Sequence, residues 1–292
     1  MAEKYEKYYV PASSPWPIIG AVGLGLIAFG AGHTVIENSK GIDGWGSNVL
    51  TAGLLVIAFM LFGWFRDQIN ESMSGMYSKQ LSASYRQGMS WFIFSEVMFF
   101  AAFFGALFYA RVIAVEWLGG ASNNAMTNEV LWPNFSAHWP LTETPGGTTS
   151  GEMGWFGLPL YNTIILIISS VTCHFAHVGL EKGKRTQLKV WLGITIILGC
   201  IFLYLQGAEY VHAYQDLGLT LDSGIYGNTF YMLTGFHGMH VTLGTVMLII
   251  MFLRVMKGHF THDNHFAFQA TSWYWHFVDV VWVCLFIFVY IL

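Results

Sequence analysis

The sequence predicts an all-α integral membrane protein with seven transmembrane helices. Charged residues make up only 10% of the 292 residues, against about 25% in a typical soluble domain. Hydrophobic residues make up 54%, and seven apolar segments approach the roughly 20 residues that a helix needs to cross a bilayer. The 12 Trp and 14 Tyr suit the aromatic belts at membrane surfaces. A net charge of −4 offers no basic surface to a nucleic acid.

The seven predicted helices follow one another with short connections except for one long one. In order they cover residues 16–36, 48–65, 88–113, 158–180, 190–213, 227–253 and 266–292. The second is short, and the sixth is interrupted by Gly235, Gly238 and two histidines. The first apolar run ends in GHTVIEN rather than in a small-residue cleavage pattern, so we interpret it as a mature helix. We expect a single membrane domain over 1–292, with the first two helices in 1–72 and the other five in 73–292.

The distribution of basic residues predicts the orientation of the chain. With the N-terminus inside, eleven of the 13 Lys and Arg fall in cytoplasmic segments, and only Lys40 and Arg111 face the other side. This asymmetry predicts a cytoplasmic N-terminus and a periplasmic C-terminus. The long outer connection, 114–157, is rich in Gly, Asn, Thr and Pro, and connections of this length often carry function or dock a partner.

Small residues in the first span predict a close helix–helix contact. Glycines there would let the backbone of another helix approach; they are Gly20, Gly23, Gly25, Gly30 and Gly32. The three cysteines have no CxxC or short pairing, which argues against a disulfide framework and a zinc site; they are Cys173, Cys200 and Cys284.

One carboxylate lies alone in the third span. Glu96 comes ten residues after Arg86, or about 15 Å along a helix, which predicts a position close to the bilayer midplane. Its own helix offers only apolar neighbours one turn away. Since burial favours the neutral acid, we expect Glu96 to be protonated and to donate a hydrogen bond to another helix or to a lipid. Two interpretations of Glu96 remain: a hydrogen bond that serves helix packing, and a site for a proton, a lipid or a small molecule.

Other ionisable residues in the spans occur in pairs three residues apart, on one helix face. The pairs are His174 with His177, Glu209 with His212, His237 with His240, and His276 with Asp279. Glu-x-x-His occurs in di-iron bundles, but the further inward glutamates at one depth are missing, since Glu209 is near the outer surface. We therefore expect interhelical hydrogen bonds and no metal site.

Two other classes of membrane protein would require sequence features that are largely missing here. A stand-alone membrane metal-dependent hydroxylase or desaturase would need several His-rich boxes near one face, and only HFTHDNH at 259–265 resembles one. A proton-coupled transporter using Glu96 would be expected to show an inverted repeat and paired broken helices, and neither is present in the sequence.

Several long motifs in order resemble subunit III of the haem–copper cytochrome c oxidases. They are RQGMSWFIFSEVMFF (86–100), GLPLYNTIILIISSVTCHFAH (157–177), LQGAEY (205–210), YGNTFYMLTGFHGMHVTLGTVMLI (226–249) and TSWYWHFVDVVWVCLFIFVYIL (271–292). The resemblance covers roughly residues 45–292 without most of the 114–157 loop.

The resemblance implies a non-catalytic subunit of a terminal oxidase. It implies no cofactor in this chain, with haems and copper in the catalytic subunit I, its main contact, and a dicopper centre in subunit II. It further implies that the first two helices lean away from the other five, leaving a V-shaped cleft filled with phospholipid. The implied roles are to keep the catalytic subunit from inactivating during turnover, to assist proton uptake and to line an oxygen route.

The resemblance also implies roles for particular residues. Glu96 matches the family's signature acid beside the cleft. Polar and lipid-facing positions of the cleft match Arg66, Asp67, Glu71, Arg86, Arg254, Lys257, His259 and Phe260. Arg donors near the inner surface suit a lipid phosphate.

The sequence departs from the family pattern at several positions. Asn70 replaces a frequent second arginine, Met76 and Tyr77 replace a histidine pair, and Val178 replaces a second histidine. One lipid contact is therefore expected to be weaker or rearranged. The 114–157 loop is longer than in mitochondrial members, which favours a bacterial cytoplasmic membrane over the mitochondrial inner membrane.

Overall fold

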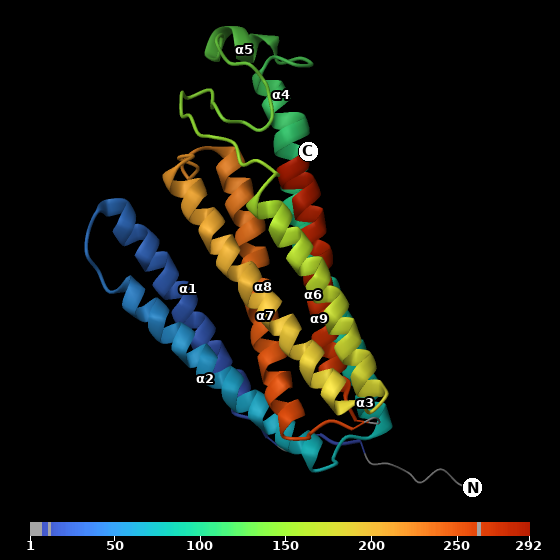
Figure 1. Cartoon of the computed structure of the whole chain (residues 1–292). Helices are drawn as coiled ribbons and strands as arrows, with labels where there is room; N and C mark the ends of the chain where they lie inside the picture. Colours follow the sequence, from blue (N-terminus) through green and yellow to red (C-terminus); the bar gives the residue numbers. More distant parts are fainter. Residues whose placement is uncertain (1–7, 11–12, 262–263) are drawn as a thin grey trace. The chain divides into compact units, whose positions relative to one another are not determined.

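The structure, a computed structural model, describes residues 8–10, 13–261 and 264–292. Its helices are α1 (Trp16–Lys40), α2 (Gly46–Met73), α3 (Lys79–Phe108), α4 (Val115–Leu118), α5 (Ala125–Leu131), α6 (Leu158–Glu181), α7 (Arg185–Gln215), α8 (Ile225–Met256) and α9 (Phe266–Leu285), with π-helical segments η1 (Tyr109–Ala114) and η2 (Phe286–Ile291) (Figure 1). Seven of the described helical spans are long and apolar enough to cross a membrane, which confirms the predicted all-α class and the number of helices.

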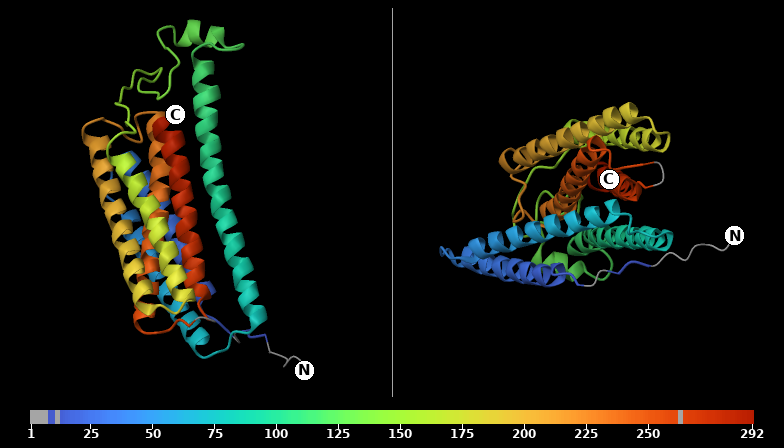
Figure 2. Two further views of the ribbon diagram at one scale, coloured as in Figure 1. Left: turned by 45° about the vertical axis from the view of Figure 1, so that its right-hand side comes forward. Right: turned by 90° about the horizontal axis from the view of Figure 1, so that it is seen from below.

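The second and third spans extend farthest beyond their predicted bounds. The second span covers Gly46–Met73 rather than 48–65, because the helix continues into the polar run that begins with Arg66 and Asp67. The third covers 40 residues, Lys79–Leu118, because α3 continues through η1 into α4 (Figure 2). At 1.5 Å per residue this span is about 60 Å long, about twice the hydrocarbon core. The outer connection therefore begins after Leu118 rather than at 114, and it contains α5.

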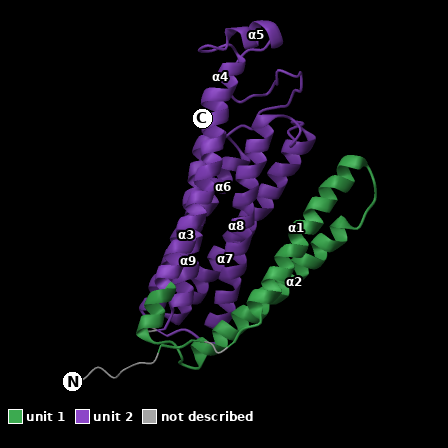
Figure 3. Ribbon diagram, turned by 180° about the vertical axis from the view of Figure 1, so that it is seen from behind, with its two compact units in different colours: residues 1–85 green, residues 86–292 purple. Residues whose placement is uncertain are grey.

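The chain forms two compact units, residues 1–85 and 86–292, whose boundary lies inside α3 (Figure 3). The single membrane domain with its division into helices of 1–72 and of 73–292 stays a prediction. The membrane orientation of the termini, the splay of the first two helices and the cleft stay predictions.

Unit 1 is built on the hairpin of α1 and α2. Pro17 lies in the first turn of α1, where a missing N–H costs nothing. The helix ends at Gly41, whose φ of 64° suits glycine, and the amide of Ile42 donates to the carbonyl of Glu37 at 3.1 Å. The carboxylate of Glu37 then accepts from the backbone N–H of Gly46 at 3.0 Å, at the start of α2. One glutamate thus joins the end of α1 to the beginning of α2.

Three of the five glycines predicted to pack against another helix do so. A Cβ on Gly30 would lie 2.3 Å from the backbone nitrogen of Leu50, and one on Gly23 would lie 2.7 Å from Ile57 Cδ1. Gly20 is buried and faces Met60. By contrast, a Cβ on Gly25 or Gly32 would meet no atom within 4 Å among the described residues. One glycine stripe of α1 therefore forms the contact with α2, while the other faces outward.

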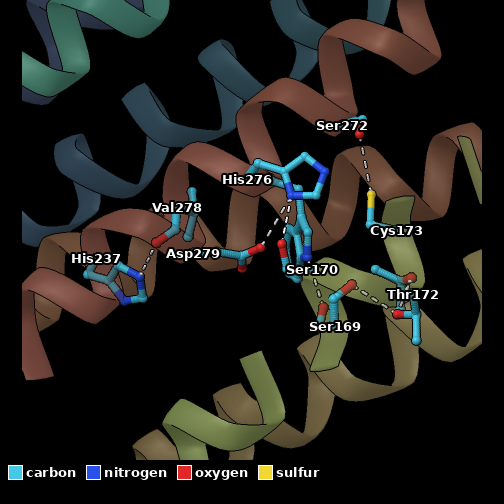
Figure 4. Close-up of polar contacts among 11 residues, drawn as sticks. Ser169, Ser170, Thr172, Cys173, His237, Ser272, His276, Val278 and Asp279 are labelled. Carbon is cyan, nitrogen blue, oxygen red and sulfur yellow. Dashed lines mark hydrogen bonds and ion pairs between the residues drawn. The ribbon is translucent and has the colours of Figure 1, made fainter. Parts of the chain in front are cut away.

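Unit 2 is held together along an antiparallel seam between α6 and α9. Trp275 and Trp282 are fully buried and donate through Nε1 to Ser169 Oγ at 2.9 Å and Thr163 Oγ1 at 3.0 Å. Farther along, Cys173 donates to the hydroxyl of Ser272 at 3.6 Å (Figure 4). The two buried tryptophans of α9 thus donate to small hydroxyl residues of α6, while Ser272 of α9 accepts from Cys173 of α6, and these bonds fix the register of the two helices.

We expect Ser169→Ala to destabilise this seam by about 1 kcal/mol, because it leaves the buried Nε1 of Trp275 without its acceptor. The measurement is the thermal midpoint of the purified complex. Ser90→Ala is the matched control, since the exposed hydroxyl of Ser90 bonds only to its own helix at Arg86. An equal midpoint in both variants would contradict the proposed role of the Ser169 hydroxyl.

Within unit 2, α3 is attached to the other helices chiefly by large side chains. Phe99 packs edge-to-face on Phe236 with ring centroids 5.0 Å apart, and Phe104 packs on Phe288 at 5.7 Å. Phe100 is only 2% exposed. These rings lie between the α3 backbone and the neighbouring helices. Few polar side chains of α3 therefore reach the rest of the unit.

Candidate functional site

Glu96 is hydrogen-bonded to a histidine on another helix of unit 2. Its Oε2 atom lies 3.0 Å from Nε2 of His240 on α8. The His240 side chain is 6% exposed and that of Glu96 22%, so both groups are largely removed from solvent. Among the described residues, this is the one side-chain hydrogen bond from the unit 2 part of α3 to another of the long helices. Of the two partners expected for Glu96, another helix or a lipid, the structure shows another helix.

The second ring nitrogen of His240 constrains the protons of this pair. Nδ1 lies 2.6 Å from the carbonyl oxygen of Phe236, and because a carbonyl only accepts, Nδ1 carries a proton and donates it. Nε2 and the Glu96 carboxyl then share one further proton, as acid and imidazole or as an ion pair. Both forms have no net charge, so the pair needs no additional counter-ion in the membrane. Which of the two groups holds the proton stays a prediction.

Aromatic rings surround the imidazole of His240. Ring centroids of Phe100, Tyr274 and Phe277 lie 5.1, 6.3 and 6.5 Å from it, and Tyr274 is stacked nearly parallel. Such rings exclude water and strengthen the bond to Glu96, because a low dielectric raises the strength of electrostatic contacts. The arrangement provides a positioning hydrogen bond inside an apolar shell.

In two of the other predicted pairs, His237 with His240 and Glu209 with His212, the side chains point at different partners. His237 is fully buried and donates from Nε2 to the carbonyl of Val278 at 3.1 Å (Figure 4), whereas His240 reaches Glu96. Glu209 is fully buried and accepts from the hydroxyl of Tyr290 at 2.5 Å. Residues three apart therefore share a broad helix face, but each finds its own neighbour, which confirms interhelical hydrogen bonds at His237, His240 and Glu209.

These contacts weigh against the hydroxylase or desaturase class. Glu96 is bound to His240 and Glu209 to Tyr290, so the two glutamates do not converge on one centre. His212, the helix partner of Glu209 in the sequence, instead pairs with Asp216 at 2.6 Å.

His276 and Asp279 are the one predicted pair whose members contact each other. Nδ1 of His276 lies 3.7 Å from Asp279 Oδ2 and 2.8 Å from the hydroxyl of Ser170 on α6 (Figure 4). The His276 side chain is 36% exposed, while that of Asp279 is 9% exposed. The imidazole thus stands at the surface of the α6–α9 seam with the carboxylate behind it.

His174 and His177 separate in the structure. His174 is exposed, and it has no hydrogen bond to any described residue. His177 turns instead toward Glu181, whose Oε1 lies 3.8 Å from its Nε2, and its ring centroid is 6.0 Å from that of His265. The sequence alone did not indicate that His177, Glu181 and His265 would lie together. The available signals were a carboxylate one turn after His177 and the histidine-rich run 259–265.

In unit 1, three tyrosines cluster around Glu71 and Gln68. Glu71 Oε1 accepts from Tyr9 at 3.2 Å, and its Oε2 lies 3.3 Å from the hydroxyl of Tyr77 and from Gln68 Nε2. Tyr85 donates to Gln68 Oε1 at 2.9 Å. Burial, with the neighbouring Tyr85 and Glu71, raises the pKa of Tyr77 well above its usual value. Tyr77 and Tyr9 thus hold the Glu71 carboxylate within unit 1.

The two other predicted lipid residues of unit 1 differ in their contacts. Asp67 accepts from Trp16 Nε1 at 2.8 Å, which links the beginning of α1 to α2. Arg66 is exposed, and its guanidinium makes no hydrogen bond or ion pair with the described residues.

The predicted lipid residues of unit 2 divide into exposed and buried ones. Arg86 and Lys257 are exposed, and the Arg86 guanidinium lies 5.5 Å above the ring of Phe266. Arg254 is 8% exposed and lies 4.5 Å above the ring of Phe260, which is 1% exposed. These two side chains pack inside the unit. Contact of any of these residues with lipid stays a prediction.

His259 lies beside these cations. Partial burial, together with the positive charges of Arg254 and Lys257, lowers the pKa of His259. At neutral pH the imidazole is therefore uncharged, and the positive charge at this end of α8 comes from Arg254 and Lys257.

Comparison with known proteins gives one consistent result. The family model described as "Cytochrome c oxidase subunit III" matches residues 6–292. Proteins named cytochrome c oxidase subunit 3 from Hippopotamus amphibius and Mus musculus are both 37% identical over 291 residues, covering 99% of this chain and 98% of the relative. The protein of that name from Oncorhynchus mykiss is 36% identical over 291 residues with the same coverage.

Proposed function

The chain belongs to the cytochrome c oxidase subunit III family, and we propose that it acts there as a non-catalytic, lipid-binding subunit that stabilises the catalytic subunit during turnover. As a member of this family it is a multi-pass membrane component of the oxidase complex, which reduces oxygen. We further propose that its main partner is the haem- and copper-bearing subunit I, with the dicopper subunit II as neighbour, and that this chain holds none of these cofactors.

The hydrogen bonds of the buried ionisable groups support our proposal that this chain is not catalytic. Glu96, Glu209 and His237 each bond to a group on another element of unit 2. Such bonds hold helices at fixed positions. Hydrogen bonds of this kind inside an apolar shell favour a supporting role for these groups over a reaction with a substrate.

An exposed polar face on α6 and α9 supports a contact with a partner subunit. His174 is exposed within a membrane span, and the His276 side chain is 36% exposed on the adjacent helix. Imidazoles are costly in contact with lipid chains, whereas a partner helix can supply hydrogen-bond acceptors. We therefore place subunit I against this face rather than lipid.

Site-specific photo-crosslinking tests this contact. A photoreactive residue in place of His174 is expected to crosslink to subunit I in the assembled oxidase. The matched control replaces Tyr204, which is 76% exposed on α7 and is expected to crosslink to lipid. Crosslinking of position 174 to lipid alone would overturn the proposed contact.

The exposed cations at the inner ends of the helices support phospholipid binding. Arg66, Arg86 and Lys257 are exposed beside apolar helical surface, and guanidinium groups suit a phosphate. Trp91, Phe94 and Met98 are exposed on α3, at spacings of three and four residues that place them on one face. That face offers apolar surface to acyl chains. We propose that lipid bound in this way fills the V-shaped cleft implied for the family.

We expect Arg86→Ala and Arg254→Ala to lower the number of phospholipids that co-purify with the oxidase, by about one each, and to shorten its working life during turnover. Arg254→Ala also removes the packing of Arg254 on Phe260, so its thermal midpoint is expected to fall as well. Lipid is counted by mass spectrometry. Lys182→Ala, a charge removed from an exposed position after α6, is the control. Unchanged lipid content in both arginine variants would contradict the proposed lipid role.

We also propose a bacterial cytoplasmic membrane as the location, with the N-terminus on the cytoplasmic side. The length of the outer connection relative to mitochondrial members and the asymmetry of Lys and Arg support this.

A further inference from the structure

We propose that His177, Glu181 and His265 form a binding site for one divalent transition-metal ion, of which Zn²⁺ is the representative, at the end of the α6–α9 seam. One potential ligand atom from each residue lies within 4.8 Å of those from the other two. The site lies outside the Glu96–His240 pair and the proposed lipid residues, and it does not depend on the lipid role.

The ligand set suits zinc. Two imidazoles and one carboxylate, with a water molecule as the fourth ligand, form a usual tetrahedral zinc site. The corresponding separations between ligand atoms are about 3.4 Å, given Zn–N bonds of about 2.0–2.1 Å. The His177 and Glu181 atoms are 3.8 Å apart, and the Glu181 side chain is 53% exposed and able to adjust. Closing the site thus needs shifts of about 1 Å.

The backbone positions all three ligands before any ion binds. His177 and Glu181 are four residues apart in the last turn of α6, so their side chains share one face. That turn also carries the negative end of the helix dipole, which favours a cation. His265 is the N-cap residue of α9. The α6–α9 register that is set by the buried Trp–hydroxyl bonds therefore brings the third ligand to the other two.

The imidazole of His177 points to a ligand, because its nearest charged neighbour, Oε1 of Glu181, lies 3.8 Å from Nε2 and is too distant for a hydrogen bond. Its Nε2 atom is buried and forms no hydrogen bond with the described residues. A buried polar atom without a partner is costly, and a metal ion would satisfy it. The ring of His177 is held in place by Phe268, with centroids 5.8 Å apart.

His265 shows the hydrogen bond that metal-binding histidines usually have. Its Nδ1 lies 3.3 Å from the carbonyl oxygen of Thr261, to which it donates. That bond fixes the ring and leaves Nε2 with a free lone pair for a metal. Glu181 supplies the negative charge that lowers the cost of placing a dication there. The ion would join the last turn of α6 to the first residue of α9 and so clamp the end of the seam.

Zinc titration of the assembled oxidase tests the site. After removal of loosely bound metal with a chelator, the complex is dialysed against Zn²⁺ alone, and bound zinc is counted by elemental analysis. We expect the unmodified complex to bind one more Zn²⁺ than the Glu181→Gln and His265→Ala variants, with binding at this site weakened by about 100-fold. Zinc bound at other surface sites of the complex does not affect the result, because the measured quantity is the difference in bound Zn²⁺ between the unmodified complex and each variant.

Two control variants and a second readout make the outcome decisive. Glu129→Gln and His138→Ala remove the same kinds of side chain from exposed positions of the outer connection, and both are expected to bind zinc as the unmodified complex does. Hydrogen exchange around residues 177–182 and 265–269 is expected to slow on Zn²⁺ addition only where the site is intact. Haem spectra report assembly. If His265→Ala fails to assemble, the exposed Glu181→Gln variant decides. Equal zinc binding and equal exchange in Glu181→Gln and the unmodified complex would overturn the site.

Discussion

Replacing Gly30 with alanine is expected to destabilise the α1–α2 hairpin by about 3 kcal/mol, although it adds a single carbon atom. The new Cβ would lie 2.3 Å from the backbone nitrogen and 2.7 Å from the Cα of Leu50. Neither atom belongs to a side chain that can rotate away, so the two helices must separate. Separation exposes the facing atoms all along the contact, because the glycine stripe brings the backbones together.

Gly25→Ala is the matched control for this prediction. It makes the same chemical change on the same helix, but its Cβ meets no atom within 4 Å among the described residues. Since alanine favours a helix by about 1 kcal/mol over glycine, this variant is expected to be neutral or slightly stabilising. The measurements are the thermal midpoint of the complex and the rate of proteolysis between Gly41 and Trp45. Equal behaviour of the two variants would show that Gly30 does not determine the helix contact.

The same glycines show how far the sequence could predict this contact. It indicated that α1 would pack closely on another helix, but not which glycines would form the contact. Gly23 and Gly30 are seven residues apart, and so are Gly25 and Gly32. Both pairs therefore form a stripe with the same period, and only the position of α2 distinguishes the packed stripe from the outward one.

A similar limit applies to the polar residues in the membrane. The cost of burying ionisable groups correctly predicted a partner on another helix for His237 and one of the two partners open for Glu96, but not for His212, which pairs with Asp216 four residues on. It could not predict the partners, because Glu96 and His240 are 144 residues apart in the sequence. The spacing of three residues correctly indicated that the members of a pair lie on one helix face. It did not predict contact between them, since among these pairs only His276 and Asp279 contact each other.

Helix ends were the least predictable part of the fold. Hydropathy marks the apolar centre of a span, but helices α2 and α3 continue into polar sequence where turns still satisfy the backbone. The polar residues Arg66 and Asp67 accordingly lie inside α2 rather than after it.

Replacing Glu96 with leucine is expected to loosen α3 by about 2 kcal/mol, while Glu96→Gln is expected to cost much less. Leucine fills similar space but leaves Nε2 of His240 without a partner in an apolar shell, and an unsatisfied buried group costs about 1–3 kcal/mol. Glutamine can still donate its amide to a neutral imidazole whose Nδ1 proton is held by Phe236. The measurements are the thermal midpoint of the oxidase and the number of turnovers before it inactivates.

Two further measurements separate a supporting role for Glu96 from a chemical one. Initial oxidase activity is expected to be nearly unchanged in Glu96→Gln, because the hydrogen bond and the shape are retained. Its complete loss would show that Glu96 takes part in electron or proton transfer. In a double-mutant cycle, Glu96→Leu is combined with His240→Leu, and the double variant is expected to be more stable than the sum of the single effects, since it leaves no orphaned group. Strict additivity would mean that the 3.0 Å contact contributes nothing to holding α3. In that case the aromatic contacts alone would attach this helix to the unit.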